Sequence, residues 1–190
     1  PGIAHDAEGR TLGTAEITVV TNVAKKSNHS EANVEIRGVG PQMWAVRPNV
    51  KIIEGRAFKP GLRELIVGRG AREEFVGLDP GATIDLNAQQ WQIVGVFSSG
   101  DAHESELVGD AESVASAYRR NGFQSVTVRL ASPQSFDVFK AALKSDPRLK
   151  VDARTTPDYY SAQSEQLIKV IRIVGIVIAT IMAIGAIFGA

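Results

Sequence analysis

The sequence contains no cysteine and no excess of charge of either sign. The absence of cysteine excludes a disulfide framework and any thiolate site, and it leaves the compartment open. Basic and acidic residues balance at 21 each; because Lys169 and Arg172 are the only charges after residue 167, residues 1–167 carry 19 − 21 = −2. Without a basic stripe, we expect no nucleic-acid partner. The 190 residues suit one domain or two small ones.

Motifs for catalysis and nucleotide binding are also missing. The chain has no G-x-x-x-x-G-K-[ST] phosphate loop and no G-x-S-x-G elbow around a nucleophilic serine. Ser105 is close to His103 in sequence, but a catalytic triad is defined in space. Gly38-Val39-Gly40 lacks the third glycine of a dinucleotide fingerprint. We therefore expect that this chain is not an enzyme and binds no cofactor.

Charge is absent from the last stretch, residues 173–190, which is IVGIVIATIMAIGAIFGA. It has 190 − 173 + 1 = 18 residues, and Thr180 is its only polar side chain. An uncharged run of about 18 residues that is apolar on every side predicts a transmembrane helix. Gly185 and Gly189 form a G-x-x-x-G pattern, which allows close helix approach, and we group Gly175 with them as candidate helix contacts in the membrane.

The first half of the chain is rich in strand signals. Residues 1–14 are polar and predict a tether. β-branched or alternating segments predict strands at 15–21, 34–37, 50–53 and 64–67, and a hairpin at 83–87 and 91–97. A short helix is expected at 71–76, where Gly77 ends it. In the second hairpin strand we expect Trp91, Ile93 and Phe97 to share one core face.

The second half predicts a strand–helix–strand unit. Residues 98–108 are polar and predict a loop, and Asp110 is a good N-cap for a helix at 111–120. A strand at 125–130 is followed by a helix that begins at Ser132-Pro133, and a further strand is expected at 149–153. Thr156-Pro157 opens the last helix. Because no breaker follows before Gly175, we expect a stiff rod that continues into the apolar run.

These elements indicate an α+β fold. If the strand at 15–21 pairs with the unit at 125–154, the β-rich middle is an insertion whose ends lie close together. We therefore predict a tether at 1–14, a discontinuous βαβ subdomain at 15–38 and 123–157, an inserted β-rich subdomain at 39–122, and a stalk helix at 158–190 that becomes transmembrane.

One cluster of potential metal ligands is visible, in the polar loop. Asp101, His103, Glu104 and Glu106 are residue types that bind cations. Consecutive residues rarely all point inward, and no second histidine is near. We therefore expect a solvated loop and no metal site.

Several short segments, in this order, are similar to a known family. They are Glu54-Gly55-Arg56-Ala57-Phe58, residues 68–78 followed by Gly81, residues 91–97, Glu104-Ser105-Glu106 with Asp110, and Asp158-Tyr159-Tyr160 with Gln163-Ser164. Together they resemble the extracytoplasmic core domain of MacB-like ABC transporter permeases, over about residues 30–165 and the helix that follows.

The resemblance implies a location and partners. The βαβ subdomain would be porter-like, and residues 1–167 would lie on the periplasmic side of the bacterial inner membrane. The permease would dimerise, pair with a cytoplasmic ABC ATPase that hydrolyses ATP, and contact a periplasmic adaptor or outer-membrane channel. It would transmit ATPase-driven motion to export or extract a substrate. The alternative is a membrane-tethered sensor or ligand-binding domain that signals through the same rod.

Overall fold

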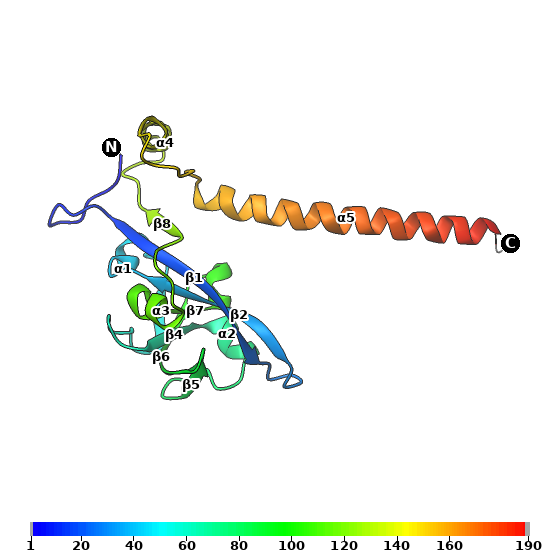
Figure 1. The fold of residues 1–190 in the computed structure, drawn as a ribbon, viewed down its shortest axis with the longest axis horizontal. Helices are drawn as coiled ribbons and strands as arrows, with labels where there is room; N and C mark the ends of the chain where they lie inside the picture. Colours follow the sequence, from blue (N-terminus) through cyan, green and yellow to red (C-terminus); the bar gives the residue numbers. More distant parts are fainter. Residues whose placement is uncertain (1, 189–190) are drawn as a thin grey trace. The chain divides into compact units, whose positions relative to one another are not determined.

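The computed structural model describes residues 2–188, except for the side chains at 160, 162–167, 169 and 183–188 of the last helix. Its contacts divide the chain into two compact units, Pro1–Phe136 and Asp137–Ala190. Unit 1 contains the β-sheet, and unit 2 contains most of α4 and the whole of α5 (Figure 1).

Unit 1 is built on one sheet of eight strands in the order β3-β6-β4-β7-β2-β1-β8, with β5 paired to β6. The strands are β1 (Gly13–Ala24), β2 (Glu31–Val39), β3 (Lys51–Gly55), β4 (Glu64–Gly68), β5 (Thr83–Leu86), β6 (Gln89–Ser98), β7 (Glu106–Asp110) and β8 (Ser125–Val128). The helices are α1 (Met43–Val46), α2 (Arg69–Glu74), α3 (Ala111–Ala117), α4 (Ser135–Ser145), α5 (Thr156–Phe188) and the 3-10 helix η1 (Ala102–Ser105). The predicted α+β class is confirmed.

The sheet is mixed. β1 and β2 form a long antiparallel hairpin, and β8 pairs antiparallel with the other side of β1. β7 joins β2 in parallel, and β4 joins β6 in parallel. Strands 15–21 and 125–128, which we expected to meet, are therefore neighbours, and the strands between them in sequence belong to the same sheet.

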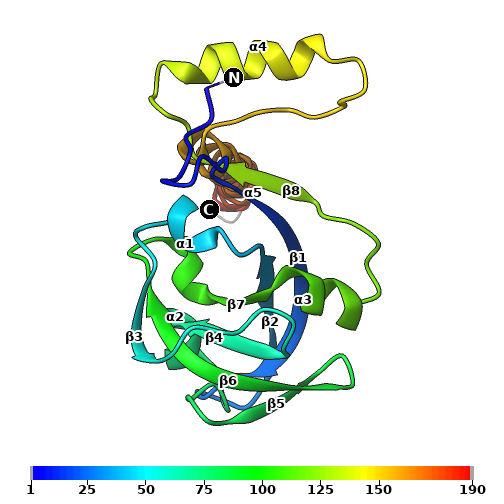
Figure 2. The ribbon, with the colours of Figure 1, turned by 90° about the vertical axis from the view of Figure 1, so that its left-hand side faces the viewer.

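The two faces of the sheet carry separate apolar clusters, because side chains alternate along each strand. One face buries Ile17, Val19 and Ile36 with residues of α3, which packs against β1 and β2 (Figure 2). The opposite face buries a smaller cluster around Phe97, composed of Val39, Met43, Val50, Phe58, Ile66, Val94, Phe97 and Val108. Beside this cluster, the second face also carries the charged side chains of Glu16, Arg37 and Glu106.

The prediction that Trp91, Ile93 and Phe97 share a face is wrong. Trp91 and Ile93 belong to the larger cluster, whereas Phe97 belongs to the smaller one. The register of β6 against β4 shifts by one residue between Ile93 and Gly95. Because a one-residue bulge moves every later side chain to the other face, β6 contributes to both clusters.

The prediction of a polar loop at residues 98–108 is also wrong. η1 lies within this segment, and β7, which begins at Glu106, is a central strand in which every residue is buried. β7 begins with Glu106 and ends with Asp110, and these two carboxylates make its sequence resemble a polar loop. Asp110 does cap α3, because its carboxylate accepts from the Ser113 amide, as predicted.

The strand expected at 149–153 does not form, so the predicted strand–helix–strand unit lacks its second strand. α5, by contrast, runs without a break from Thr156 to Phe188, as predicted. In the described part of the chain, no helix is both long and apolar enough to cross a membrane. The transmembrane helix predicted at 173–190 is thus not found there, and the side chains at 183–190 lie outside that part.

Gly38 offers a test of the packing between α3 and the sheet. A Cβ at this position would lie 2.6 Å from Ile17 Cγ2 and 2.8 Å from the Ala111 Cα. We expect Gly38→Ala to lower the free energy of unfolding by about 1–3 kcal/mol, since overpacking forces backbone shifts. Urea unfolding of unit 1 measures this. Gly122→Ala is the matched control, because nothing lies within 4 Å of its Cβ, and equal effects of the two changes would contradict the packing argument.

Candidate functional site: a buried ion-pair network

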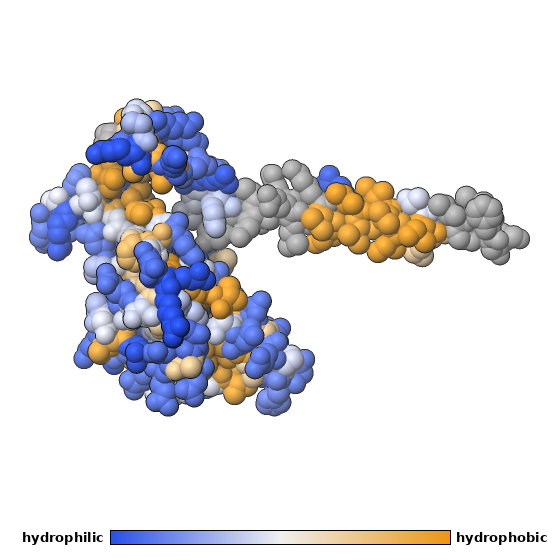
Figure 3. Space-filling model, viewed as in Figure 1, coloured by the Kyte–Doolittle hydropathy of each residue, from blue (hydrophilic) through white to orange (hydrophobic). Residues whose placement is uncertain are grey.

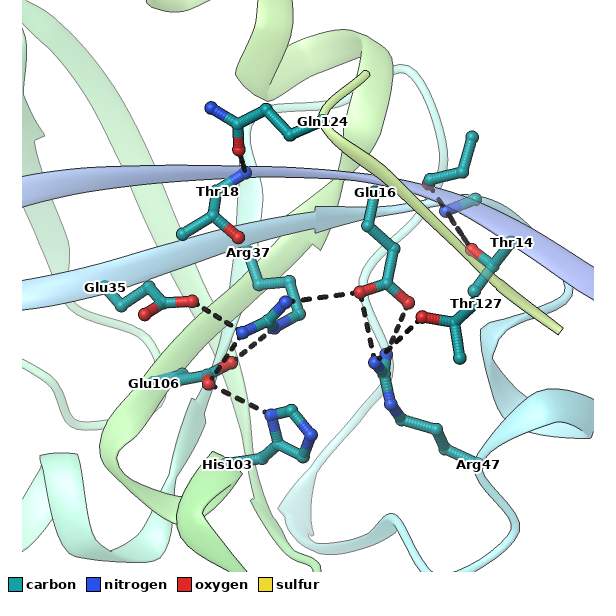
Figure 4. A network of polar contacts seen from close by, with 12 residues as sticks. Thr14, Glu16, Thr18, Glu35, Arg37, Arg47, His103, Glu106, Gln124 and Thr127 are labelled. Atoms are coloured by element: carbon teal, nitrogen blue, oxygen red, sulfur yellow. Dashed lines mark hydrogen bonds and ion pairs between the residues drawn. The ribbon is translucent and has the colours of Figure 1, made fainter. Parts of the chain in front are cut away.

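Charged side chains gather on the second face of the sheet, beside the smaller apolar cluster. Glu16 of β1, Arg37 of β2 and Glu106 of β7 come from three adjacent strands, and all are buried or nearly so. Their neighbours in sequence, including Ile17, Ile36 and Leu107, point to the opposite face. The alternation of the strands therefore brings the three charges together (Figure 4).

Arg37 is the centre of the network. Its Nε and Nη2 donate to the two oxygens of Glu106 at 2.6 and 2.9 Å, a bidentate pair. Nη2 also donates to Glu35 Oε1 at 2.5 Å, and Nη1 donates to Glu16 Oε2 at 3.2 Å. Burial opposes the charge of Arg37, but the hydrogen bonds and charge of Glu106 outweigh it and raise the Arg37 pKa.

Glu16 holds a second guanidinium. Its side chain is 1% exposed, and its oxygens lie 2.8 and 3.0 Å from Nη1 and Nη2 of Arg47. Arg47 follows α1, so this contact ties the connection between α1 and β3 to β1. Arg47 Nη2 also lies 3.5 Å from Thr127 Oγ1 of β8, at the limit of a hydrogen bond.

His103 closes the other side of the network. Its Nδ1 lies 3.0 Å from Glu106 Oε1, and the ring is buried under η1. Burial alone would raise the pKa of Glu106, but the hydrogen bonds from His103 and Arg37 lower it to about 2. Burial raises the pKa of Glu35, and the nearby Glu106 carboxylate adds to that effect.

The arrangement suits a structural joint better than a catalytic centre. Each of the buried carboxylates faces a guanidinium, and the contacts span β1, β2, β7, η1 and the α1–β3 connection. Such a network, once formed, is costly to break, because removal of one partner leaves a buried charge. It therefore fixes the relative positions of five segments, in which η1 and β7 are far in sequence from β1, β2 and the α1–β3 connection.

The predicted cluster at 101–106 is divided between two roles. Asp101 caps η1, and Glu104 accepts from Ser98 Oγ and from the amides of Ser99 and Gly100. Those hydrogen bonds, led by the one from Ser98, lower the Glu104 pKa to about 2. His103 and Glu106 enter the ion-pair network instead of a solvated loop, which corrects our expectation. Among the described residues, no group of three or more His, Asp or Glu is arranged to hold a metal ion.

The candidate glycine contacts lie elsewhere. A Cβ on Gly175 of α5 would meet nothing within 4 Å. Gly185 and Gly189 lie outside the residues whose side chains the structure describes.

Sequence reasoning missed Glu16, Arg37 and Arg47. The available signal was weak: Glu35-Ile36-Arg37 alternates as a half-exposed strand does, and charges on such a strand normally face water. The long-range pairing of β2 with β7 and the contact of Arg47 with Glu16 bury these charges, and neither can be inferred from one segment.

Two open grooves lie where β1 meets β8 and the N-terminal segment. Their volumes are about 700 and about 610 Å³. Both are lined by Arg10, Gly13, Ala15 and Gln42; the first adds Val126 and Val128, and the second adds Asp110 and Phe123.

Comparison with solved structures identifies the class of fold. The periplasmic region of MacB from Actinobacillus actinomycetemcomitans matches with a TM-score of 0.58 and 16% identity, over 80% of this chain and 75% of that chain. The extracellular domain of the ABC-type transporter YknZ from Gram-positive bacteria matches with a TM-score of 0.56 and 16% identity, over 73% and 71%. At this identity the likeness shows the fold. No curated protein matches the chain.

The family is shown by sequence. The model of the MacB-like periplasmic core domain matches residues 4–146, which is most of the chain, so the chain belongs to that family. It is the periplasmic domain of a MacB-like ABC transporter permease, and the resemblance seen in the sequence is confirmed. The family is one of transporter permease domains and not of enzymes.

Removal of the central guanidinium tests the network. We expect Arg37→Met to lower the free energy of unfolding by about 3 kcal/mol, because Glu106 and Glu16 then lose a buried partner. Denaturant unfolding measures the change. Arg10→Met is the control, since Arg10 is 68% exposed in its pairs with Asp6 and Glu8; we expect a loss of less than about 1 kcal/mol there. A loss of similar size in both variants would show that Arg37 is not a buried link.

The pH dependence of stability tests Glu106. Its pKa is lowered from 4.5 to about 2 in the folded protein, so ionised Glu106 stabilises the fold above pH 4.5. That contribution disappears as the pH falls through this window towards 2. We expect Glu106→Gln to be less stable than the wild type at pH 7, and the difference to shrink steadily between pH 4.5 and 2. Thermal unfolding across this range measures it, and a difference independent of pH would refute the assignment.

Proposed function

We propose that this chain is the extracytoplasmic part of a permease subunit that transmits motion from an ABC ATPase to the periplasmic side of the membrane. The observation that supports this most directly is α5, an unbroken helix of 33 residues that follows a MacB-like periplasmic core domain. At about 1.5 Å per residue its length is about 50 Å. A continuous helix of this length is stiff enough to carry a displacement between a membrane and a soluble body.

The surface of α5 supports a membrane location for its C-terminal part. Large apolar side chains are exposed along the described stretch, and Figure 3 shows the apolar surface of one side of it. The exposed residues are Ile168, Val170, Ile171, Ile173, Val174, Ile176, Val177, Ile178, Ile181 and Met182. Thr180 donates its hydroxyl to the Ile176 carbonyl within the helix, so its polar group is satisfied without water. A surface that is apolar on every side fits lipid or neighbouring helices. Residues 1–167 would then lie outside the cytoplasm.

The proposed partners follow from this location. A cytoplasmic ABC ATPase would supply ATP hydrolysis, since the sequence has no phosphate loop. A second permease subunit would contact the membrane helices, and Gly175, with open space at its Cβ, offers a position for close helix approach, together with Gly185 and Gly189. A periplasmic adaptor or an outer-membrane channel would receive the substrate.

The first test is an isolation of the complete permease in detergent. It should bring down an ABC ATPase, and a correctly inserted permease that recovers none would overturn the proposal and favour a tethered sensor.

The second test measures motion. In a permease–ATPase complex whose other cysteines have been replaced, a spin label at Asp85→Cys, on exposed β5, reports the position of unit 1. We expect the label-to-label distance between subunits to shift between the nucleotide-free and ATP–vanadate states. Ile171→Pro, which breaks α5, should remove most of the shift, whereas Ile171→Ala should retain it. A change in ATPase rate alone does not support the proposal, because the test requires the label-to-label distance to differ between the two nucleotide states.

A further inference from the structure

Two chain segments of unit 1 lie side by side at one end of β1. Ala4 donates its amide to the Arg129 carbonyl at 2.8 Å, and Ala131 donates to the Gly2 carbonyl at 2.9 Å. Ile3 and Leu130 form the antiparallel bridge between these contacts. The N-terminal segment and the segment that leads from β8 to α4 are therefore hydrogen-bonded to each other where they leave the sheet.

Both segments are also bonded to β1. Leu12, just before β1, donates to the Ala4 carbonyl at 2.8 Å and accepts from the Arg129 amide at 3.0 Å. β8 then pairs with β1 from Gly13 to Glu16. One short ladder thus connects two chain segments to the same end of one strand.

Side chains reinforce this ladder on both sides. The backbone amide of Gln124 donates to the Glu16 carbonyl at 2.9 Å, and the side-chain Oε1 of Gln124 accepts from the Thr18 backbone amide at 2.7 Å. Gln124 therefore extends the pairing to the residue before the first residue of β8. Arg129 Nη1 donates to the Ala45 carbonyl at 3.3 Å and links the other end of β8 to α1.

The ladder leads directly to the buried network. Glu16, whose backbone accepts from Gln124, uses its carboxylate to hold Arg37 and Arg47. A displacement of β8 therefore acts on β1 and, through the ion pairs, on β2, on β7 and on the α1–β3 connection.

Resting on the proposed function, we infer that the β1–β8 ladder is a rigid coupling joint. Through it, motion of the two chain arms moves the whole sheet as one body, and β8 stays attached throughout the cycle. Thr127 and Gln124 are positioning residues of this joint. In the opposite arrangement, β8 would be a strap that detaches from β1 during the cycle. The experiments below distinguish a rigid joint from such a strap.

The first experiment uses proline on the two sides of β8. The Arg129–Leu12 hydrogen bond and the alternation of the ladder orient the Thr127 amide towards β1 and the Val126 amide towards the outer edge. We expect Thr127→Pro to lose most of the nucleotide-dependent shift of the Asp85→Cys label in the complete complex. Val126→Pro, the matched control, should retain it, because proline is tolerated where the amide faces outward.

The second experiment locks the joint. Ala15 and Val126 face each other as a non-hydrogen-bonded pair, a geometry that accepts a cross-strand disulfide. We expect the Ala15→Cys/Val126→Cys complex to show the full nucleotide-dependent change, measured by fluorescence with a genetically encoded label at position 85, in both oxidised and reduced forms. A disulfide at Thr83→Cys/Gln92→Cys, within the β5–β6 hairpin, is the control for oxidation itself.

The outcomes are distinct. Loss of motion on oxidation, restored by reductant and absent in the hairpin control, would show a detaching strap and overturn the inference. A folded Thr127→Pro complex with an unchanged shift would overturn it as well; if that variant does not fold, the disulfide decides. A wild-type complex with no nucleotide-dependent shift would instead refute the proposed function.

Discussion

The bidentate contact between Arg37 and Glu106 is the interaction on which the arrangement of unit 1 depends. It joins β2 to a parallel strand that follows much later in sequence, and through Glu16 it extends to β1 and to Arg47. Buried ion pairs add little net stability, but an unpaired buried charge is costly. The network therefore acts mainly by selecting one strand register, because a shift of one residue in β1, β2 or β7 would direct a charge into the larger apolar cluster.

The sequence predicted most elements of unit 1 and the continuity of α5, because strand alternation, N-caps and stop signals are local properties. It failed where the outcome depends on distant partners. β7 begins with a glutamate that only Arg37 and His103 make compatible with a central strand. The bulge in β6 appears only in its register against β4, which lies far from it in sequence.

The candidate site was the least predictable feature for the same reason. Glu16, Arg37 and Arg47 belong to three segments, and nothing within any one segment shows that its charge is covered. His103 and Glu106 were recognised as a polar cluster, but their neighbour Glu104 has a different role in the η1 turn. The family resemblance, in contrast, depended on the order of several short segments along the chain. That order can be recognised in the sequence without knowledge of any single contact.

The parallel pairing of β2 with β7 has a consequence for how the domain folds. In the paired register Glu35 is opposite Glu106, so 106 − 35 = 71 positions separate the two strands. Contacts of such long range form slowly, because much chain entropy is lost before they contribute. The β1–β2 hairpin joins strands that are close in sequence, so we expect it to form earlier, with Arg37 and Glu16 on a face that β7 has not yet extended. The centre of the sheet closes only after residues 106–110 are available to pair with β2, so this domain completes its core late.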